Sequence, residues 1–439
     1  MSRTANVSPA QGVTTIKVDC LARVEGEGAL HVKIKAGRLQ HVQLQIYEPP
    51  RLFEAFLRGR MAPEAVDITA RICGICPIAY QMSAAHAIER AWGLTIHPQV
   101  RALRRLFYCG EWIESHALHV FCLHAPDFLG CQDVIEMAAA HKAEVEMALR
   151  LKKLGNELVR VLGGREIHPI SACVGGFHKV PTKQEAASLV NELKWALQAS
   201  EAAAKLVATF PFPEFNPNYE YVSLCHPDEY PFNEGRIVSN KGIDIDTADY
   251  EDTFLEQHVK HSNALHSVVR ERGSYHVGPL ARYNLNFEKL PDSVRLLARE
   301  LHAEPPLYNP FKSILVRCFE LMFSCHEALR IIAEYEPPPE PHVEATPRAG
   351  RGMAVTEAPR GSLYHRYETD AEGKIVSARI VPPTSQNLKR IEDDLWQFLP
   401  QILDQPVDEI TWRAEQAIRN YDPCISCATH FLRVYLELE

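Results

Sequence analysis

Two short stretches far apart in the chain, RICGICP at residues 71–77 and DPCISCATH at residues 422–430, carry two cysteines at the same spacing. Cysteines at positions i and i+3 just before a helix present both sulfurs to one point, and the helix N-terminus favours their thiolate form. Each stretch is therefore suited to clamp a metal ion. The first cysteines of the two pairs are 351 residues apart (424 − 73 = 351), so a four-sulfur site would join both ends of the fold.

The composition is that of a globular chain whose main partners are small molecules or proteins. A chain of 439 residues with 46% hydrophobic content can bury a large core. A formal net charge of -9 argues against nucleic acid or an anionic membrane surface as the main partner. The N-terminus has no apolar signal region and no run of 18 apolar residues occurs, so we expect a cytoplasmic protein.

The cysteines are too sparse for a disulfide scaffold, since there are 12 in the whole chain. In a reducing compartment, a CxxC pair more often binds a metal or does redox chemistry. The eight cysteines outside the two pairs are scattered, mostly among apolar residues, and are predicted to fill the core. These eight are Cys20, Cys109, Cys122, Cys131, Cys173, Cys225, Cys318 and Cys325.

The hydrophobic pattern predicts a mainly α fold with small β hairpins, of the α+β class, with a central bundle of long helices. Alternating apolar residues on both sides of AGR, residues 36–38, predict an N-terminal hairpin within a β segment at 14–50. A helix is predicted from Pro77 to a glycine cap at Gly93. Apolar residues at helical spacing predict four long amphipathic helices in the bundle, at about 100–120, 134–163, 182–210 and 309–335.

The C-terminal part is predicted to contain a hairpin, then a helix that leads into the second cysteine pair. The Pro-rich run at 336–342 marks a crossing between a helical body at 51–335 and this part, at 343–439. SLYHRYETDAEGKIVSARIV, residues 362–381, is predicted to turn near Asp370–Gly373, and the last helix to be capped by Asp408. We expect all segments to belong to one domain spanning 1–439.

Three readings of the four cysteines differ in how well they fit this spacing. Structural zinc favours two CxxC knuckles about 15 to 20 residues apart in a small unit that lacks a core. A thioredoxin-like dithiol has a single pair in a βαβ setting. Four thiolates on a large rigid body fit a catalytic site better, and soft sulfur ligands suit nickel, iron or copper(I).

Several motifs together resemble the large, catalytic subunit of nickel-iron hydrogenases. RICGIC and DPCISCATH resemble its two cysteine signatures, and the likeness extends over nearly the whole chain. It includes ARVEGEG at 22–28, ESHALH at 114–119, HVGPLAR at 276–282, EAPRG at 357–361 and VPPTSQNL at 381–388. The sequences of these segments are most like those of the soluble cytoplasmic branch of the family, which is of the NAD(P)-linked and sulfhydrogenase type. The resemblance implies an oxidoreductase that interconverts dihydrogen with protons and electrons.

The resemblance also implies the ligands of a nickel-iron centre. Cys73 and Cys424 would be terminal nickel ligands, and Cys76 and Cys427 would bridge nickel to iron. The iron in this family also holds carbon monoxide and cyanide, for which Arg360, Thr384, Pro359 and Pro383 would form the surroundings. Arg360 would lie above the open metal position, where its charge polarises dihydrogen as it splits, and Asp422 would orient Arg360.

Proton transfer and a second cation site follow from the same resemblance. Cys424 would take the proton first, and Glu25 would pass it on. Without the resemblance, Glu25 would be interpreted as a solvated residue. Glu27, two positions along the chain, is the competing candidate for the relay. Glu54, His430 and a backbone carbonyl near Ile380 would bind magnesium. The histidines of ESHALH and of REIHP (His116, His119 and His168) are expected to be core or supporting residues.

The expected partners are an iron-sulfur small subunit and a flavin-bearing diaphorase-type module that handles NAD(P). The remaining cysteines lack the close spacings of iron-sulfur clusters, and no GxGxxG fingerprint for a dinucleotide occurs. Nickel-insertion proteins and a maturation protease are implied too, the latter removing the residues after His430. Two alternatives remain open. One is a scaffold subunit like the quinone-reducing respiratory relative, and the other is a zinc-stabilised interaction protein.

Overall fold

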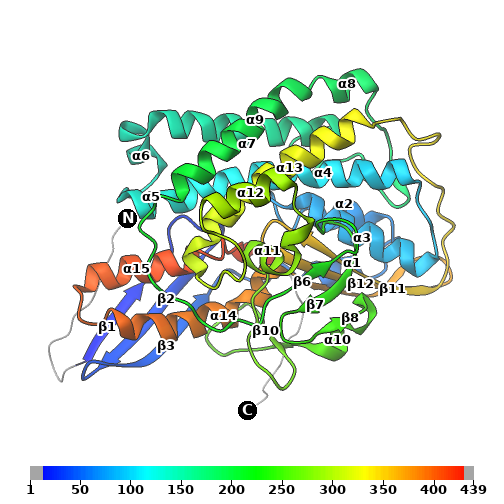
Figure 1. The fold of residues 1–439 in the computed structure, drawn as a ribbon. Helices are drawn as coiled ribbons and strands as arrows, with labels where there is room; N and C mark the ends of the chain where they lie inside the picture. The colour runs from blue at the N-terminus through cyan, green and yellow to red at the C-terminus, as the bar shows by residue number, and fades with distance from the viewer. Residues whose placement is uncertain (1–12, 430–439) are drawn as a thin grey trace, which may run out of the picture.

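Long helices pack side by side in the upper half of the molecule in Figure 1, which draws a computed structural model that describes residues 13–429. The bundle consists of α4 (Pro98–Ala117), α7 (Lys142–Gly163), α9 (Val190–Val207) and α13 (Ser313–Ala333). Helices α4 and α7 approach closely where two glycines face each other. A Cβ added at Gly155 would lie 2.7 Å from the carbonyl oxygen of Gly110 and 2.6 Å from the backbone nitrogen of Glu114. The predicted bundle is thus present, and its closest crossing depends on these glycines.

Two of the helices predicted as continuous are broken. The segment 134–163 divides into α6 (Val134–Ala140) and α7, with His141 outside helical geometry between them. The segment 182–210 divides into α8 (Lys183–Ala187) and α9. α8 begins after Thr182, the predicted start of this segment, where Thr182 and Glu185 form a capping box. Apolar residues recur at helical spacing on both sides of each break, so periodicity alone does not reveal the breaks.

Helix α3 (Pro77–Trp92) begins directly after the first cysteine pair and follows α1 (Phe53–Leu57) and α2 (Glu64–Ala70). Pro77 occupies the first helical position and Gly93 has a left-handed φ of 63° at the C-terminal cap, as predicted. Nearly every side chain of α3 is buried. The loop that holds Cys73 and Cys76 is therefore anchored to the core on its C-terminal side.

The N-terminal β segment forms a three-stranded antiparallel sheet at the lower left of Figure 1. Its strands are β1 (Val13–Val18), β2 (Gly28–Lys35) and β3 (Arg38–Ile46), in the order β1-β2-β3. The predicted hairpin is confirmed, with Leu30 paired to Leu44 and Val32 to Val42. β1 lies, except for Val13, within the predicted β segment at 14–50 and adds a third strand to the predicted hairpin. The buried face of the sheet packs on α14 (Pro383–Phe398) and α15 (Val407–Arg419), which completes a second core.

A second three-stranded sheet carries the EAPRG motif, in the order β11 (Gly350–Ala358), β12 (Gly361–Thr369) and β13 (Ile375–Val381). The predicted hairpin corresponds to β12 and β13. The sequence did not predict β11, which pairs along the whole of β12 and makes Pro359 and Arg360 a two-residue turn between Ala358 and Gly361. α15 leads into the second cysteine pair as expected, but its N-terminal cap is Pro406, and Asp408 lies in its first turn.

The segment between α9 and α13, expected within the helical body, holds short strands as well as helices. Its elements are β6 (Val222–Cys225), β7 (Arg236–Ser239), β8 (Asp244–Ile245), α10 (Tyr250–Thr253), β9 (Phe254–Gln257), β10 (His266–Val269), α11 (Pro279–Asn286) and α12 (Asp292–Glu300). The other α-helices and strands of the described residues are α5 (Ala125–Leu129), β4 (Ala172–Cys173), β5 (Gly176–Phe177) and the one-turn helix α16 (Ile425–Ala428). None of the helices between residues 13 and 429 has the length and apolarity needed to cross a bilayer.

The eight scattered cysteines are only partly core residues. Cys109, Cys131, Cys318 and Cys325 are buried. The prediction is wrong for Cys20, which is exposed beyond the end of β1, and Cys122, Cys173 and Cys225 are half-buried. Apolar neighbours in the sequence belong to both faces of an element, so they do not decide which face a cysteine takes.

Candidate metal centre

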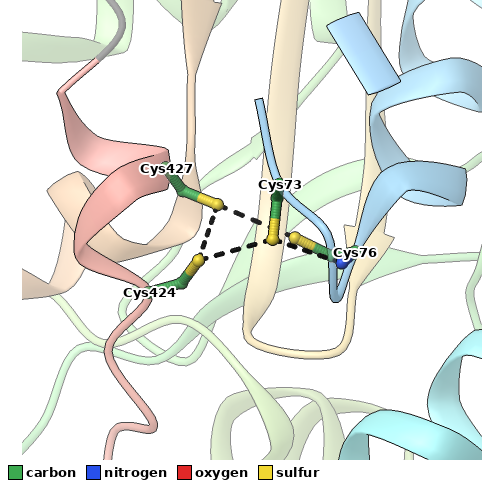
Figure 2. Close-up of side chains that lie close together, drawn as sticks. All are labelled: Cys73, Cys76, Cys424 and Cys427. Atoms are coloured by element: carbon green, nitrogen blue, oxygen red, sulfur yellow. Dashed lines mark hydrogen bonds between the residues drawn. The ribbon is translucent and has the colours of Figure 1, made fainter. Parts of the chain in front are cut away.

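The four cysteines of the two CxxC pairs meet in the interior (Figure 2). Cys73 and Cys76 lie on the loop between α2 and α3, and Cys424 and Cys427 lie at the start and within the single turn of α16. The Sγ atoms of Cys73 and Cys424 are 3.5 Å apart, those of Cys76 and Cys427 3.7 Å, and those of Cys424 and Cys427 2.9 Å. All four residues are buried. The structure thus brings together the four predicted ligands.

The donor set fits a soft cation. Hydrogen bonds from the other three thiols lower the pKa of Cys73 well below its usual value, and nearby Arg360 lowers it further. Burial, together with the neighbouring sulfurs, raises the pKa of Cys424. Four thiolates cannot share so small a buried space without a compensating cation, and thiolate sulfur prefers soft or borderline metals such as nickel, iron and zinc. The sulfur geometry therefore supports a metal centre, without deciding which metal it holds.

Arg360 lies at the tip of the β11–β12 turn and is buried beside the sulfurs. Its Nε donates to the backbone carbonyl of Asp422 at 2.7 Å, and one Nη donates to the Asp422 carboxylate at 3.0 Å. The predicted orienting partner is therefore in place. Asp422 itself has a left-handed φ of 51°, which a non-glycine residue adopts at a cost. The other Nη is 3.5 Å from Ser115 Oγ, a contact that the sequence did not suggest.

Glu25 reaches the cysteine centre directly. Its Oε2 accepts hydrogen bonds from the Cys424 thiol and from the backbone N–H of Ser426, both at 3.0 Å. The backbone of Glu25 pairs with that of Cys424 as an isolated parallel bridge, in which Ile425 N–H donates to Glu25 O at 2.9 Å. Glu27, two residues away, is exposed. Of the two candidates, Glu25 and not Glu27 thus contacts the cysteine centre.

The residues predicted to surround the diatomic iron ligands converge on the same place from two elements. Pro359 precedes Arg360 in the β11–β12 turn, and Pro383 and Thr384 open α14. All are buried, and Thr384 Oγ1 accepts a hydrogen bond from the Cys424 backbone N–H at 3.0 Å. Its hydroxyl proton can still be donated to another acceptor. An apolar wall with a few donors suits small ligands of this kind.

Two of the three residues predicted to bind magnesium are neighbours. Glu54, in α1, accepts a hydrogen bond from the backbone N–H of Ile380 in β13 at 2.8 Å. Glu54 is half-buried. The third residue, His430, lies outside the described residues, as does the tail that follows it.

One supporting residue, Arg51, became visible only in the structure. Arg51 donates through Nη2 to the carbonyl of Ile72 at 2.6 Å and also to the carbonyl of Ser426, so it links the two cysteine loops. The sequence offered no signal for this role beyond a charged residue near Glu54. The three histidines take protein partners as expected. His116 Nε2 is 2.9 Å from Glu320 Oε2, and His119 and His168 donate to the carbonyls of Arg419 and Ala70.

Comparison with known proteins supplies the identity of the metal centre. The family described as nickel-dependent hydrogenase matches residues 51–154 and 274–430, which is more than half of the chain. Sulfhydrogenase 1 subunit alpha of Pyrococcus furiosus is 33% identical over 95% of this chain and 98% of its own length. The NAD-reducing hydrogenase HoxS subunit beta of Cupriavidus necator is 27% identical, with 94% of each chain covered.

Solved structures of hydrogenases share the fold. An NAD⁺-reducing [NiFe]-hydrogenase in the H2-reduced state superposes with a TM-score of 0.87 and 26% identity, covering 97% of this chain and 100% of the other. A Dm. baculatum [NiFeSe]-hydrogenase superposes with a TM-score of 0.79 over 95% of this chain and 100% of the other. The resemblance, the fold class and the enzyme class are confirmed, and the scaffold and zinc-protein alternatives give way to them. The chain belongs to the nickel-dependent hydrogenases, as a catalytic large subunit of the nickel-iron type.

Proposed function

We propose that this subunit splits dihydrogen heterolytically at the four-cysteine centre, that Cys424 and Glu25 carry the proton away, and that the electrons pass through an iron-sulfur subunit to NAD(P). The observation that carries the proposal is the 3.0 Å contact between Glu25 Oε2 and Cys424 Sγ, inside a buried centre that also contains Arg360. When bound, the nickel-iron centre would bind dihydrogen and accept its electrons.

The proton path begins at the Cys424 sulfur. A general base must lie within hydrogen-bond reach of the proton it takes, and Glu25 Oε2 meets that condition. The Ser426 N–H bond fixes the carboxylate oxygen that faces the sulfur. Glu25 is half-buried, so its other side can hand the proton toward solvent. Proton entry and exit would use the same residue, as a reversible reaction requires.

Arg360 would stabilise charge that develops as dihydrogen is polarised. A fixed cation in a water-excluded site acts more strongly than the same cation in water, because it does not have to reorganise during the reaction. Asp422 holds the guanidinium at two points and so fixes its direction. Thr384, Pro359 and Pro383 would line the carbon monoxide and cyanide ligands of iron on the same side.

The electron partner would cover the outer side of the Cys73–Cys76 loop. Gly74, between these two cysteines, is exposed, and Ile75 is half-buried, so the metal ligands come within one residue of the surface there. The similarity to an NAD-reducing hydrogenase favours an iron-sulfur small subunit followed by a flavin-bearing diaphorase-type module. A link to NAD(P) would place the complex in the cytoplasm.

Glu54, the carbonyl of Ile380 and His430 would hold magnesium, with water completing the octahedral shell. The hydrogen bond between Glu54 and Ile380 already brings the first two residues together. Nickel-insertion proteins would load the centre. A maturation protease would then remove the residues after His430, and leave a terminal carboxylate beside this site. The whole length 1–439 before processing would act as one domain, since its two ends supply one centre.

Metal analysis combined with turnover tests the proposal. The purified complex should contain one nickel and one iron in each copy of this subunit, and should oxidise dihydrogen with NAD⁺ or NADP⁺ as the acceptor. Infrared spectra should contain stretching bands of carbon monoxide and cyanide. Zinc in place of nickel, or dihydrogen oxidation that reduces neither nucleotide in the intact complex, would contradict the metal or the carrier assignment respectively.

A further inference from the structure

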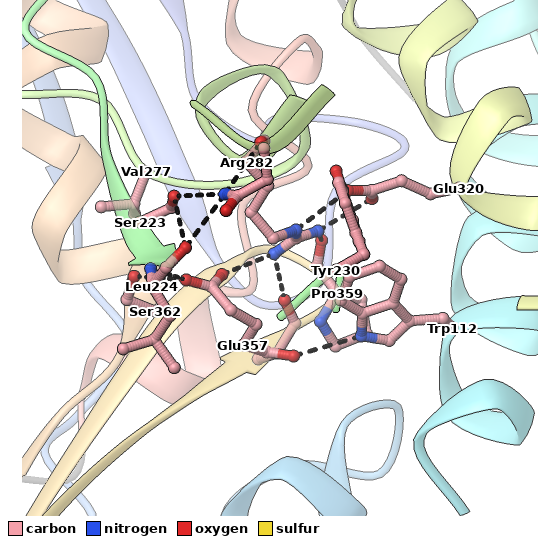
Figure 3. Close-up of polar contacts among 12 residues, drawn as sticks. Trp112, Ser223, Leu224, Tyr230, Val277, Arg282, Glu320, Glu357, Pro359 and Ser362 are labelled. Carbon is pink, nitrogen blue, oxygen red and sulfur yellow. Dashed lines mark hydrogen bonds and ion pairs between the residues drawn. The ribbon is translucent and has the colours of Figure 1, made fainter. Parts of the chain in front are cut away.

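Arg282, in α11, is the centre of a fully buried ionic cluster between α11, α13 and β11 (Figure 3). Its Nε and one Nη bind both oxygens of Glu320, each at 2.9 Å, and the other Nη binds Glu357 Oε2 at 2.9 Å. The Arg282 guanidinium lies 4.2 Å from the centre of the Trp112 indole ring. Arg282, Glu320 and Glu357 have no exposed surface. Burying such a cluster costs desolvation energy, so the hydrogen bonds that it makes have to compensate for this cost.

Two further hydrogen bonds of Arg282 go to the chain that carries Arg360. Its Nη atoms donate to the carbonyl of Ala358 at 2.7 Å and to that of Pro359 at 2.9 Å. A guanidinium has five N–H donors, and the five acceptors around Arg282 use all of them. The two residues directly before Arg360 are therefore fixed by the same planar group that binds the two carboxylates.

The loop before α11 also contacts the turn of Arg360 closely. Gly278 has φ 117°, and a Cβ there would lie 2.8 Å from the carbonyl oxygen of Arg360. Gly361 has φ 134°, and a Cβ there would lie 2.7 Å from Val277 Cγ2 and 2.8 Å from Gly278 N. HVGPLAR and EAPRG thus pack backbone against backbone. The position of α11 determines where the Arg360 turn can lie.

We propose that Arg282 is a positioning residue for Arg360: its guanidinium fixes the carbonyls of Ala358 and Pro359, and thereby sets how the Arg360 side chain faces the cysteine centre. The inference rests on the proposed role of Arg360 in polarising dihydrogen. Glu320 and Glu357 hold the Arg282 fork in its plane. Arg282 itself touches neither the cysteines nor Asp422 in any hydrogen bond of the described residues.

Arg282→Lys tests this role because it keeps the charge and removes the planar set of five donors. An ammonium has three donors at one point and cannot serve two carboxylates and two carbonyls together. Arg104→Lys is the matched control. Arg104 is equally buried and binds both oxygens of Glu89 at 2.8 and 2.6 Å. It is remote from Arg360, because it lies 11 residues, or about 16 Å along α4, before Ser115, the residue that contacts Arg360.

The experiment is a double-mutant cycle of Arg282→Lys with Arg360→Lys in the intact, metal-loaded complex. The measurements are kcat per nickel, the nickel and iron contents, and the infrared bands of the iron ligands. Because a displacement of about 1 Å at a catalytic group can cost roughly 10²-fold, we expect Arg282→Lys to lower kcat by about that factor, with normal metal content. In the Arg360→Lys background the same change should lower kcat by less than about threefold, since it acts only through Arg360. Arg104→Lys should lower the thermal midpoint and leave kcat per nickel and the infrared bands unchanged.

Equal losses from Arg282→Lys in both backgrounds would overturn the inference and leave the role of Arg360 intact. An unchanged kcat for Arg360→Lys would instead refute the proposed role of Arg360, and the inference with it. If Arg282→Lys does not accumulate as a metal-loaded enzyme, Gly278→Ala replaces it in the cycle, since its methyl group would displace the Arg360 carbonyl. A kcat per nickel for Gly278→Ala equal to that of the wild type would overturn the inference.

Discussion

Replacing Glu25 with glutamine should block proton transfer without disturbing the metal centre. Glu25 Oε2 is within direct hydrogen-bond distance of the Cys424 sulfur, so no intervening water is needed and the full effect of general base catalysis should be lost. Such a loss is typically 10² to 10⁴-fold. At about 1.4 kcal/mol for each factor of ten, a loss of about 10³-fold raises the barrier by about 4 kcal/mol.

The change in stability should be small by comparison. A glutamine oxygen can still accept the hydrogen bond from Ser426 N–H, and the backbone pairing between residue 25 and Cys424 does not depend on the side chain. Replacing a charged acceptor by a neutral one at a half-buried site costs about 1 kcal/mol. Nickel and iron contents should therefore remain normal.

Isotope exchange is the direct assay. Deuterium gas mixed with the enzyme in light water should yield HD and H2 about 10³-fold more slowly with Glu25→Gln than with the wild type. Glu27→Gln is the matched control, since Glu27 is exposed and should leave the exchange rate unchanged. An exchange rate for Glu25→Gln equal to that of the wild type, with full metal loading, would refute the assignment of the relay to Glu25.

Three further predictions concern the metal, the ionic interior and the tail. Cys424→Ser should abolish dihydrogen turnover and deplete nickel. Its circular dichroism spectrum should remain that of a folded chain, because most of the buried core lies outside the cysteine cluster. A variant that kept both nickel and activity would refute the ligand assignment. For Asp127, burial alone would raise the pKa, but His124, Arg419 and Arg23 outweigh it and lower the pKa from 3.8 to about 2. The ionised carboxylate therefore stabilises the fold above about pH 4, and this contribution is lost as the pH falls toward 2. Asp127→Asn should accordingly lower the free energy of unfolding by about 2 kcal/mol at pH 7, with a difference that shrinks below pH 4 in denaturant titrations; a difference independent of pH would contradict this account. Intact mass spectrometry of the active complex should find this subunit ending at His430, and full activity in a subunit that still ends at Glu439 would exclude maturation by cleavage.

The parts of the fold that could be predicted from sequence are those with a local cause. Pro77 and Gly93 bound α3 because proline fits a first helical turn and glycine a left-handed cap. Alternating apolar residues predicted β2 and β3, because one face of their sheet is buried. β11 was missed because its sequence, GRGMAVTEA, begins with two glycines that lower its strand propensity. A Cβ at Gly350 or Gly352 would lie within 2.2 Å of α3 carbonyl oxygens, so tertiary contact requires glycine at these strand positions.

The candidate site likewise contains residues that the sequence revealed and residues that only the structure revealed. Cysteine pairs have few alternative uses, so the four ligands could be named before the fold was known, and the resemblance supplied Glu25 and Arg360. Arg51 lies outside the motifs that carry the resemblance. Ser115 and Arg282 belong to ESHALH and HVGPLAR, but the resemblance assigned no role to either residue. Their roles come from long-range contacts that no spacing encodes: Arg51 bridges the two cysteine loops, Ser115 faces the Arg360 guanidinium, and Arg282 binds the carbonyls before Arg360. A centre assembled from both ends of a chain needs such connecting residues, since neither cysteine loop can fix its position relative to the other by local structure.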